Sequence, residues 1–176
     1  MEEWYAYPLL VVVGFIVGFI NTVAGGGSLL SLPILIFLGL PSTLANGTNR
    51  VAVIFQTAIA TAGFKSKGVS TFPFNLYLGC SSFIGSIIGA NLAVDISGAL
   101  FNRILAVVMI CVVLIIAFGP KISTNEVQER LTGKYLWLGV IAFFFIGIYG
   151  GFINAGIGFI IILFLHYINK MTLVRS

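Results

Sequence analysis

The sequence predicts an all-α membrane protein, a polytopic helical bundle with a glycine-broken first helix and an internal repeat whose second copy is incomplete. Composition is the first observation: 59% of the 176 residues are hydrophobic and 8% are charged, with a mean hydropathy of +1.12. Soluble globular domains lie far from these values. The nine Lys and Arg residues are scattered, so the net charge of +4 does not indicate a nucleic-acid partner.

The second observation is the break in the first apolar stretch. Pro8 to Leu40 contains no charged residue, and as one straight helix it would be about 50 Å long against a hydrocarbon core of about 30 Å. Gly25, Gly26 and Gly27 interrupt it, and glycine is a poor helix former. We therefore expect two half-helices, about Pro8–Val23 and Ser28–Leu40, joined by unwound backbone.

Such a break is a candidate anion site. Ser28 is expected at the N-cap of the second half-helix, where free N–H groups and the positive end of the helix dipole face the break. Discontinuous transporter helices bind substrate carboxylates in this way. The alternative is that the glycines only allow close helix packing.

The third observation is the repeat. Gly151-Phe152-Ile153-Asn154 repeats Gly18-Phe19-Ile20-Asn21, and each copy precedes further glycines on an apolar segment. A repeat of this kind is typical of transporters with two pseudo-symmetric halves. It makes three residues the second-repeat counterpart of the first break: Asn154, Gly156 and Gly158.

Three more apolar segments lie between the two copies, at about Thr43–Phe64, Phe72–Val94 and Leu100–Phe118. In the second of them Gly85 and Gly89 are four residues apart, which predicts a face for close helix packing. The third has no polar interior and is expected to face lipid.

The polar stretch 119–134 divides the chain. We expect a first transmembrane repeat over 1–118, a cytoplasmic linker over 119–134 with a short surface helix around Glu126 to Leu131, and the truncated start of a second repeat over 135–176. Loops 65–71 and 119–134 carry most of the Lys and Arg of the loops, so both are predicted to be cytoplasmic. If the glycine-broken segment doubles back, the N-terminus is outside and the halves are inverted; if it crosses once, the N-terminus is inside and the halves are parallel.

Polar residues inside membrane segments are costly and need an explanation. Amide and hydroxyl donors beside one permanent cation suit a small oxyanion. The predicted anion-binding residues are Gly25, Gly26, Gly27, Ser28, Asn46, Thr48, Asn49 and Arg50. The alternatives are an interfacial anchor for Arg50 and helix-to-helix hydrogen bonds for Asn46 and Asn49.

An enzyme is not predicted. Asp95 and the glutamates lie at segment ends or in the linker, and no nucleophile is paired with a base, so no catalytic residue is assigned. His166 is the only histidine and no cluster has metal-ligand spacing, so no metal or cofactor is expected. A non-transporting membrane scaffold is the remaining alternative.

Three motifs of the sequence resemble the N-terminal repeat of the sulfite exporter TauE/SafE family: the opening GFINTVAGGGSLLSLPIL, the following LPSTLANGTNRVAV and the closing AGFKSKG. A fourth motif, GGFINAGIG, resembles the start of that family's second repeat. The resemblance implies a multi-pass permease of the plasma membrane that carries small anions such as sulfite or sulfonates by secondary transport. Compared with that family, we expect most of a second repeat, including a counterpart of Asn46 to Arg50, to be missing from these 176 residues. The expected partners are therefore a small anion, the lipid bilayer, and a second copy or a missing C-terminal half.

Overall fold

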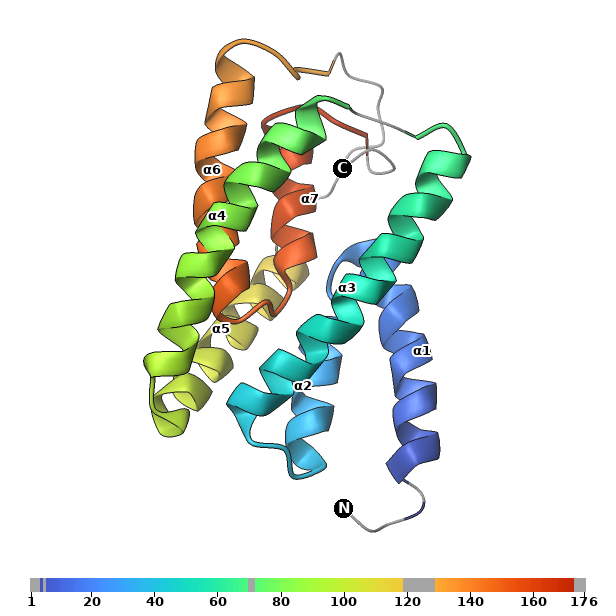
Figure 1. Cartoon of the computed structure of the whole chain (residues 1–176), viewed down its shortest axis with the longest axis vertical. Coiled ribbons are helices and arrows are strands. Elements are labelled where there is room, and N and C mark those ends of the chain that lie inside the picture. The colour runs from blue at the N-terminus through green and yellow to red at the C-terminus, as the bar shows by residue number, and fades with distance from the viewer. Residues whose placement is uncertain (1–3, 5, 70–71, 119–128, 173–176) are drawn as a thin grey trace.

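The computed structural model describes residues 4, 6–69, 72–118 and 129–172. Over these residues the chain is helical, with no strand (Figure 1). The helices are α1 (Ala6–Ala24), α2 (Ser28–Phe37), α3 (Ser42–Ser66), α4 (Phe74–Asp95), α5 (Gly98–Phe118), α6 (Lys134–Phe152) and α7 (Ile157–Tyr167). The all-α prediction is confirmed, and the broken first segment forms two helices as expected.

Four helices are long and apolar enough to cross a membrane among the described residues: α1, α4, α5 and α6. α2 and α7 are shorter apolar helices. α3 spans 25 residues but is less apolar because it carries the Asn46, Asn49 and Arg50 cluster. Large apolar side chains point outward all around the bundle, as Phe15 at 80% exposure and Phe118 at 83% illustrate, which is typical of a surface that lipid covers.

Two helical hairpins run in opposite directions. In Figure 1, α1 ascends to the first break and α2 descends from it, whereas α6 descends to the second break and α7 ascends. Because the first segment doubles back, the arrangement is the inverted one of the two alternatives. The C-terminal end of α3 and the N-terminal end of α6 lie at one end of the molecule, and the N-terminal end of α1 lies at the other.

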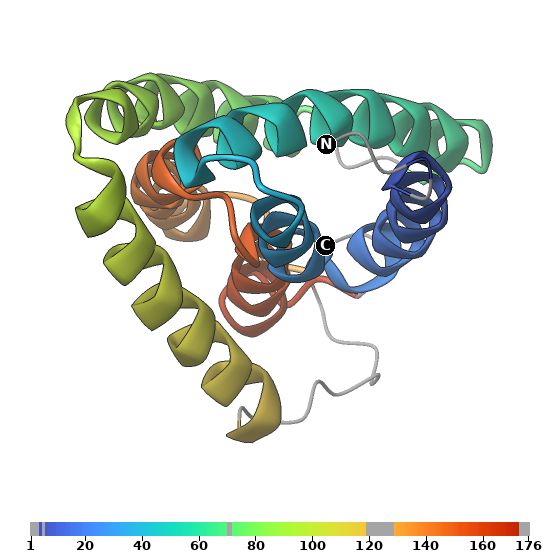
Figure 2. The ribbon, with the colours of Figure 1, turned by 90° about the horizontal axis from the view of Figure 1, so that it is seen from below.

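The short helices occupy the middle of the bundle. Figure 2 shows α2, α6 and α7 on the inner side of α1, α3, α4 and α5. The main buried cluster joins Leu32 of α2 with Phe101 of α5 and with Ile153 and Ala155 of the α6–α7 connection. Irregular backbone at the second break is thereby covered by protein, as its position in a membrane protein requires.

The tightest helix pair is α4 against α6, and glycines make it possible. A Cβ atom on Gly85 would lie 2.1 Å from the carbonyl oxygen of Phe144, and one on Gly89 would lie 2.0 Å from that of Ile148. The prediction of close packing at Gly85 and Gly89 is confirmed. The hydroxyl of Ser81 donates to the carbonyl of Val140 at 2.6 Å across the same contact.

Some sequence-based boundaries differ from the structure. The second segment ends at Phe37 and not at Leu40, because the chain turns at Gly39, whose φ is +92°. The prediction of a surface helix around Glu126 to Leu131 is wrong for residues 129–131, which are not helical. The reason is that the backbone of Arg130 forms hydrogen bonds with Asn169 instead. Residues 126–128 lie outside the described part. One face of α5 is buried at Phe101, Leu105 and Val112, so that helix faces lipid on one side only.

Candidate functional site

The two helix breaks share an unusual backbone conformation. Gly25, at the end of α1, has φ +68°, and Gly156, at the N-cap of α7, has φ +67°. Asn154 also adopts a positive φ of 59°, and asparagine is one of the few non-glycine residues that adopt this conformation. Glycine has no Cβ atom and adopts this conformation without steric strain, which explains the glycine at Gly25 and at Gly156.

The breaks touch each other. A Cβ atom on Gly25 would lie 2.4 Å from the carbonyl carbon of Gly158, and one on Gly158 would lie 2.4 Å from the Cα of Gly25. The residue that follows α1 therefore lies against the first turn of α7, with backbone against backbone. The repeat predicted that the two breaks are equivalent, but it did not predict that they are in contact.

The glycines of the first break have different roles. Gly27 is closely packed, because a Cβ atom there would lie 2.5 Å from the carbonyl oxygen of Val17. Gly26 is more open, and the nearest neighbour of such an atom is the Cδ1 of Leu29 at 3.8 Å. Only Gly26 leaves room for a further group to approach the backbone.

Ser28 is not the N-cap of α2, and that prediction is wrong. The N-cap is Gly27, whose φ of −56° and ψ of −34° are already helical and which has no side-chain cap. The N–H of Gly27 donates instead to the Oδ1 of Asn21 at 3.3 Å, so this N–H, expected to be free, is used within the protein. Ser28 accepts a hydrogen bond at 3.1 Å from the Nδ2 of Asn49.

A neutral polar network links α1, α2 and α3. The hydroxyl of Ser31 donates to the Oδ1 of Asn49 at 2.6 Å, and the Nδ2 of Asn21 donates to the Oε1 of Gln56 at 3.1 Å. Ser31, Asn21 and Gln56 were absent from the predicted binding set. Helical spacing could have indicated Ser31 and Gln56, since Ser31 lies one turn after Ser28 and Gln56 lies two turns after Asn49.

Asn46 and Arg50 reach the other break. The Nδ2 of Asn46 donates to the carbonyl of Phe152 at 3.0 Å. The Nη2 of Arg50 donates to the same carbonyl at 3.1 Å and also to that of Gly151. These carbonyls end α6, and a cation there is favoured by the negative end of the helix dipole. One turn of α3 thus caps a helix of the second repeat.

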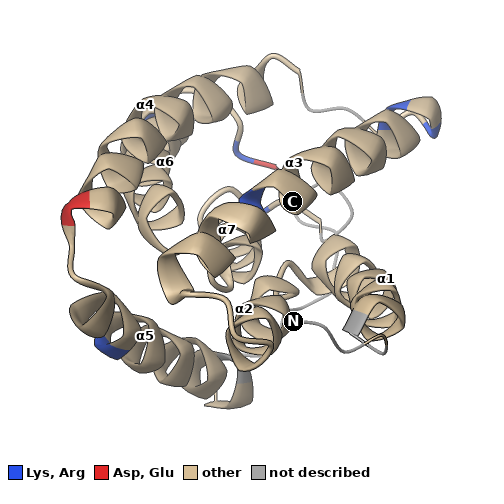
Figure 3. Ribbon diagram, turned by 60° about the horizontal axis from the view of Figure 1, so that its bottom comes forward, with Lys and Arg blue, Asp and Glu red and all other residues tan. Residues whose placement is uncertain are grey.

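Charge is scarce elsewhere in the bundle. Figure 3 shows the charged residues gathered mostly at helix ends, whereas Arg50 lies two turns into α3. The interfacial-anchor alternative does not describe its contacts, because its guanidinium binds carbonyls inside the protein.

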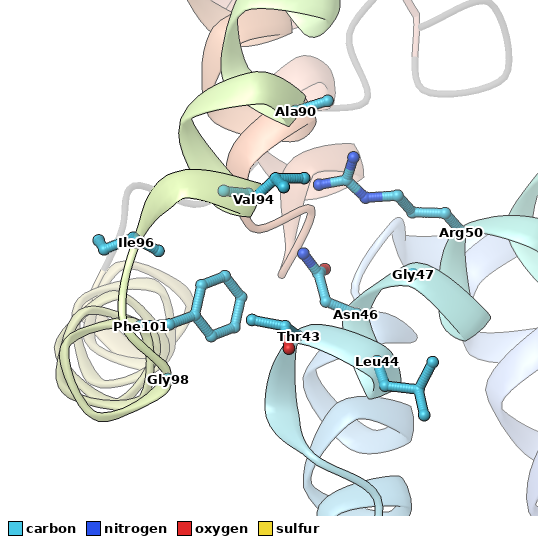
Figure 4. A pocket seen from close by; sticks show the side chains of 11 residues that line it. Thr43, Leu44, Asn46, Gly47, Arg50, Ala90, Val94, Ile96, Gly98 and Phe101 are labelled. Atoms are coloured by element: carbon cyan, nitrogen blue, oxygen red, sulfur yellow. The ribbon is translucent and has the colours of Figure 1, made fainter.

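A cavity of 500 Å³ lies beside these two side chains, bounded by α3, α4 and α5. Figure 4 shows Asn46 and Arg50 extending from α3 toward Val94 and Phe101 across it. Within the described residues, the Nε of Arg50 and the Oδ1 of Asn46 are buried without a hydrogen-bond partner. Buried polar atoms normally have partners, so this turn of α3 retains unused hydrogen-bonding capacity beside the cavity.

The predicted anion-binding residues do not form one cluster. Asn46 and Arg50 border the 500 Å³ cavity, whereas Ser28, Thr48 and Asn49 border a second cavity of 260 Å³ between α1, α2 and α3. A Cβ atom on Gly156 would lie 2.7 Å from Val112 of α5, so this glycine packs closely against α5. Substrate binding by any of these residues stays a prediction.

No group of three or more His, Cys, Asp or Glu residues is placed to hold a metal ion in the described part of the chain. The Nδ1 of His166 lies 3.0 Å from the carbonyl oxygen of Met171. That contact ties the end of α7 to the segment that follows it.

Opposed helix breaks around polar side chains define the class, a polytopic membrane protein with the architecture of inverted-repeat transporters. The chain belongs to the family described as sulfite exporter TauE/SafE, whose model matches residues 10–176.

The chain is similar to several proteins named as probable membrane transporter proteins. It is 32% identical over 150 residues to one from Haemophilus influenzae, a match that covers 85% of this chain and 58% of the relative. It is 33% identical over 156 residues to the protein YfcA of Escherichia coli K12, covering 86% of this chain and 57% of the relative. A relative from Methanocaldococcus jannaschii is 29% identical, covering 89% and 61%.

The chain thus spans about three-fifths of the length of the relatives it matches. No solved structure gives a significant match.

Proposed function

We propose that this chain forms the first repeat and the core of a secondary transporter for small oxyanions, with sulfite and sulfonates as the substrate class. The observation that carries the proposal is the contact between Gly25 and Gly158. It brings the first break against the first turn of α7, and Leu29 in the first turn of α2 lies 3.5 Å from a Cβ atom built on Gly156, the N-cap of α7. The N-terminal ends of α2 and α7 are therefore close to the same point, and a helix N-terminus is a favourable site for negative charge.

The anion is expected to use two separate groups in succession along its path, because Gly26 is not among the residues that line the cavity beside Arg50. Gly26 supplies backbone that is open to approach, and Arg50 supplies a permanent positive charge beside the 500 Å³ cavity. One Arg50 nitrogen, Nη2, is held by α6, so the remaining guanidinium N–H groups are the ones proposed to bind the anion. A pyramidal or tetrahedral oxyanion is small compared with this cavity.

Alternating access follows from the inverted hairpins. In the proposed mechanism the two hairpins rock about the contact between Gly25 and Gly158, and the anion is exposed first on one side and then on the other. No acidic residue lies inside α1, α2, α3, α6 or α7, so the driving ion is not assigned to a side chain.

The experiment is flux of radiolabelled sulfite and of a small sulfonate in proteoliposomes. The 176-residue chain is compared with a version extended by a complete second repeat. We expect flux from the extended version, at a rate that Arg50→Gln lowers by tenfold or more. Absence of anion flux from both versions, with normal insertion, contradicts the proposal and favours a scaffold.

A further inference from the structure

The α1 helix carries two glycines whose counterparts on α6 are at the centre of a helix contact. Aligning Gly18-Phe19-Ile20-Asn21 with Gly151-Phe152-Ile153-Asn154 and continuing backward without a gap pairs Gly14 with Gly147. The same register pairs Trp4 with Trp137 at the start of the two helices. Gly14 and Gly18 of α1 are therefore equivalent to Gly147 and Gly151 of α6, and the same register holds along both helices.

On α6 this face is filled. A Cβ atom on Gly147 would lie 2.2 Å from the carbonyl oxygen of Ser82, and one on Gly151 would lie 2.2 Å from that of Ser86. The partner helix α4 contributes its own pair, Gly85 and Gly89, to the same contact. Later residues of α4 contact later residues of α6, so the two helices run parallel. Two small-residue faces thus bring the backbones together.

On α1 the equivalent face is open. Within the described structure, no atom outside the helix lies within 4 Å of a Cβ atom built on Gly14 or Gly18. Both glycines border the 260 Å³ cavity. Phe19 is 67% exposed, whereas its counterpart Phe152 packs against Phe101, with ring centroids 5.9 Å apart.

We propose that the face of α1 formed by Gly14 and Gly18 docks a transmembrane helix equivalent to α4. This helix runs parallel to α1 and presents small residues four positions apart. It comes from the part of the permease that the longer relatives have and this chain does not span, since the chain covers only 57% of the E. coli relative and 58% of the H. influenzae relative.

A second copy of this chain fits the face less well. Its only equivalent of the required helix is α4, and the Gly85 and Gly89 face of that helix is already covered by its own α6. Exposing it would break the tightest helix contact of the bundle. The inference concerns assembly and does not rest on anion transport.

Co-purification from membranes tests the proposal. The tagged chain is co-expressed with the longest stretch of the E. coli relative that lies outside the match. A double variant, Gly14→Leu with Gly18→Leu, fills the face, and Gly63→Leu is the matched control because Gly63 on α3 is equally open. We expect the unaltered chain and Gly63→Leu to retain the partner and the double variant to lose it by tenfold or more.

A second measurement excludes misfolding. Among the described residues, nothing outside the helix lies within 4 Å of a Cβ atom built on Gly14 or Gly18, and the carbonyl of Gly18 that accepts from Gln56 is kept in the variant. The melting temperature of the double variant without the partner is therefore expected to stay within about 2 °C of the unaltered chain, as surface substitutions usually do. Retention of the partner by the double variant overturns the proposal, as does failure of the unaltered chain to capture it. A disulfide joining two copies of a Gly14→Cys variant assigns the face to a second copy instead and also overturns it.

Discussion

At the scale of single residues, neighbouring glycines of the first break have different physical roles. Gly25 has a left-handed backbone and touches Gly158, whereas Gly26 has neither constraint. A run of three glycines in the sequence therefore combines one position needed for conformation and contact, one for close packing against α1, and one for access to the backbone.

Alanine substitutions should separate these roles. Gly25→Ala combines a left-handed residue, which costs about 1–2 kcal/mol, with overpacking against Gly158 backbone, which costs about 1–3 kcal/mol. We expect a clear fall in the melting temperature in detergent. Gly26→Ala is the matched control and should leave the melting temperature nearly unchanged. Equal melting temperatures for the two variants would contradict the contact between the breaks.

Arg50 has two roles that different substitutions can separate. Arg50→Gln removes the charge that caps α6 and should cost about 1–2 kcal/mol of stability. Arg50→Lys keeps a cation for the carbonyls but loses the planar set of donors. If the guanidinium binds the anion, the Lys variant should be close to normal in melting temperature and still lose most sulfite flux in the extended protein. Normal flux from Arg50→Lys would limit Arg50 to capping α6.

At the scale of elements, the α4–α6 pair fixes how the two repeats join. Each helix contributes glycines four residues apart, and the contact is made by backbone atoms. Association of helices inside a membrane depends on such close packing, because lipid supplies no hydrophobic driving force between apolar faces.

A large side chain in this contact should separate the helices. In Gly147→Leu the new Cβ atom alone would lie 2.2 Å from the carbonyl oxygen of Ser82, so we expect aggregation or a strongly lowered melting temperature. Gly79→Leu on α4 is the control, since nothing lies within 4 Å of a Cβ atom there. Size-exclusion profiles and thermal melts in detergent measure both. A well-folded Gly147→Leu protein would show that α4 and α6 do not pack in this way.

At the scale of the whole molecule, opposed hairpins meet at their breaks and α3 connects them. Gln56 of α3 donates to the carbonyl of Gly18 at 2.7 Å, and Arg50 donates to that of the equivalent Gly151. One helix therefore binds corresponding carbonyls in both repeats, and this makes the two breaks a single structural unit.

The inverted arrangement predicts a definite topology. Single cysteines at Lys67 and Lys134 should react with a membrane-impermeant thiol reagent from the same side, expected to be the cytoplasm by the positive-inside rule. A cysteine at Tyr7 should react only from the opposite side. Cys80 and Cys111 are both exposed on helix surfaces and are first replaced by serine. Labelling of Lys67→Cys and Lys134→Cys from different sides would exclude the inverted arrangement.

The sequence by itself determined the elements. Apolar runs of membrane-spanning length, interrupted by one glycine triplet and by turn residues, predicted the helices to within a few residues, because hydropathy and backbone preference are local properties. The repeated Gly-Phe-Ile-Asn motif likewise predicted two equivalent breaks, and Gly85 with Gly89 predicted a packing face.

Only the tertiary structure decided which residues meet. The contact between Gly25 and Gly158 and the capping of α6 by Asn46 and Arg50 join residues that are far apart in the chain. The tertiary structure also divides the predicted binding residues between two cavities. The wrong N-cap assignment of Ser28 has the same origin, since Asn21 and Asn49 compete for those hydrogen bonds from other helices. Local sequence preferences contain no information about partners that approach through packing, and the geometry of a site depends on those partners.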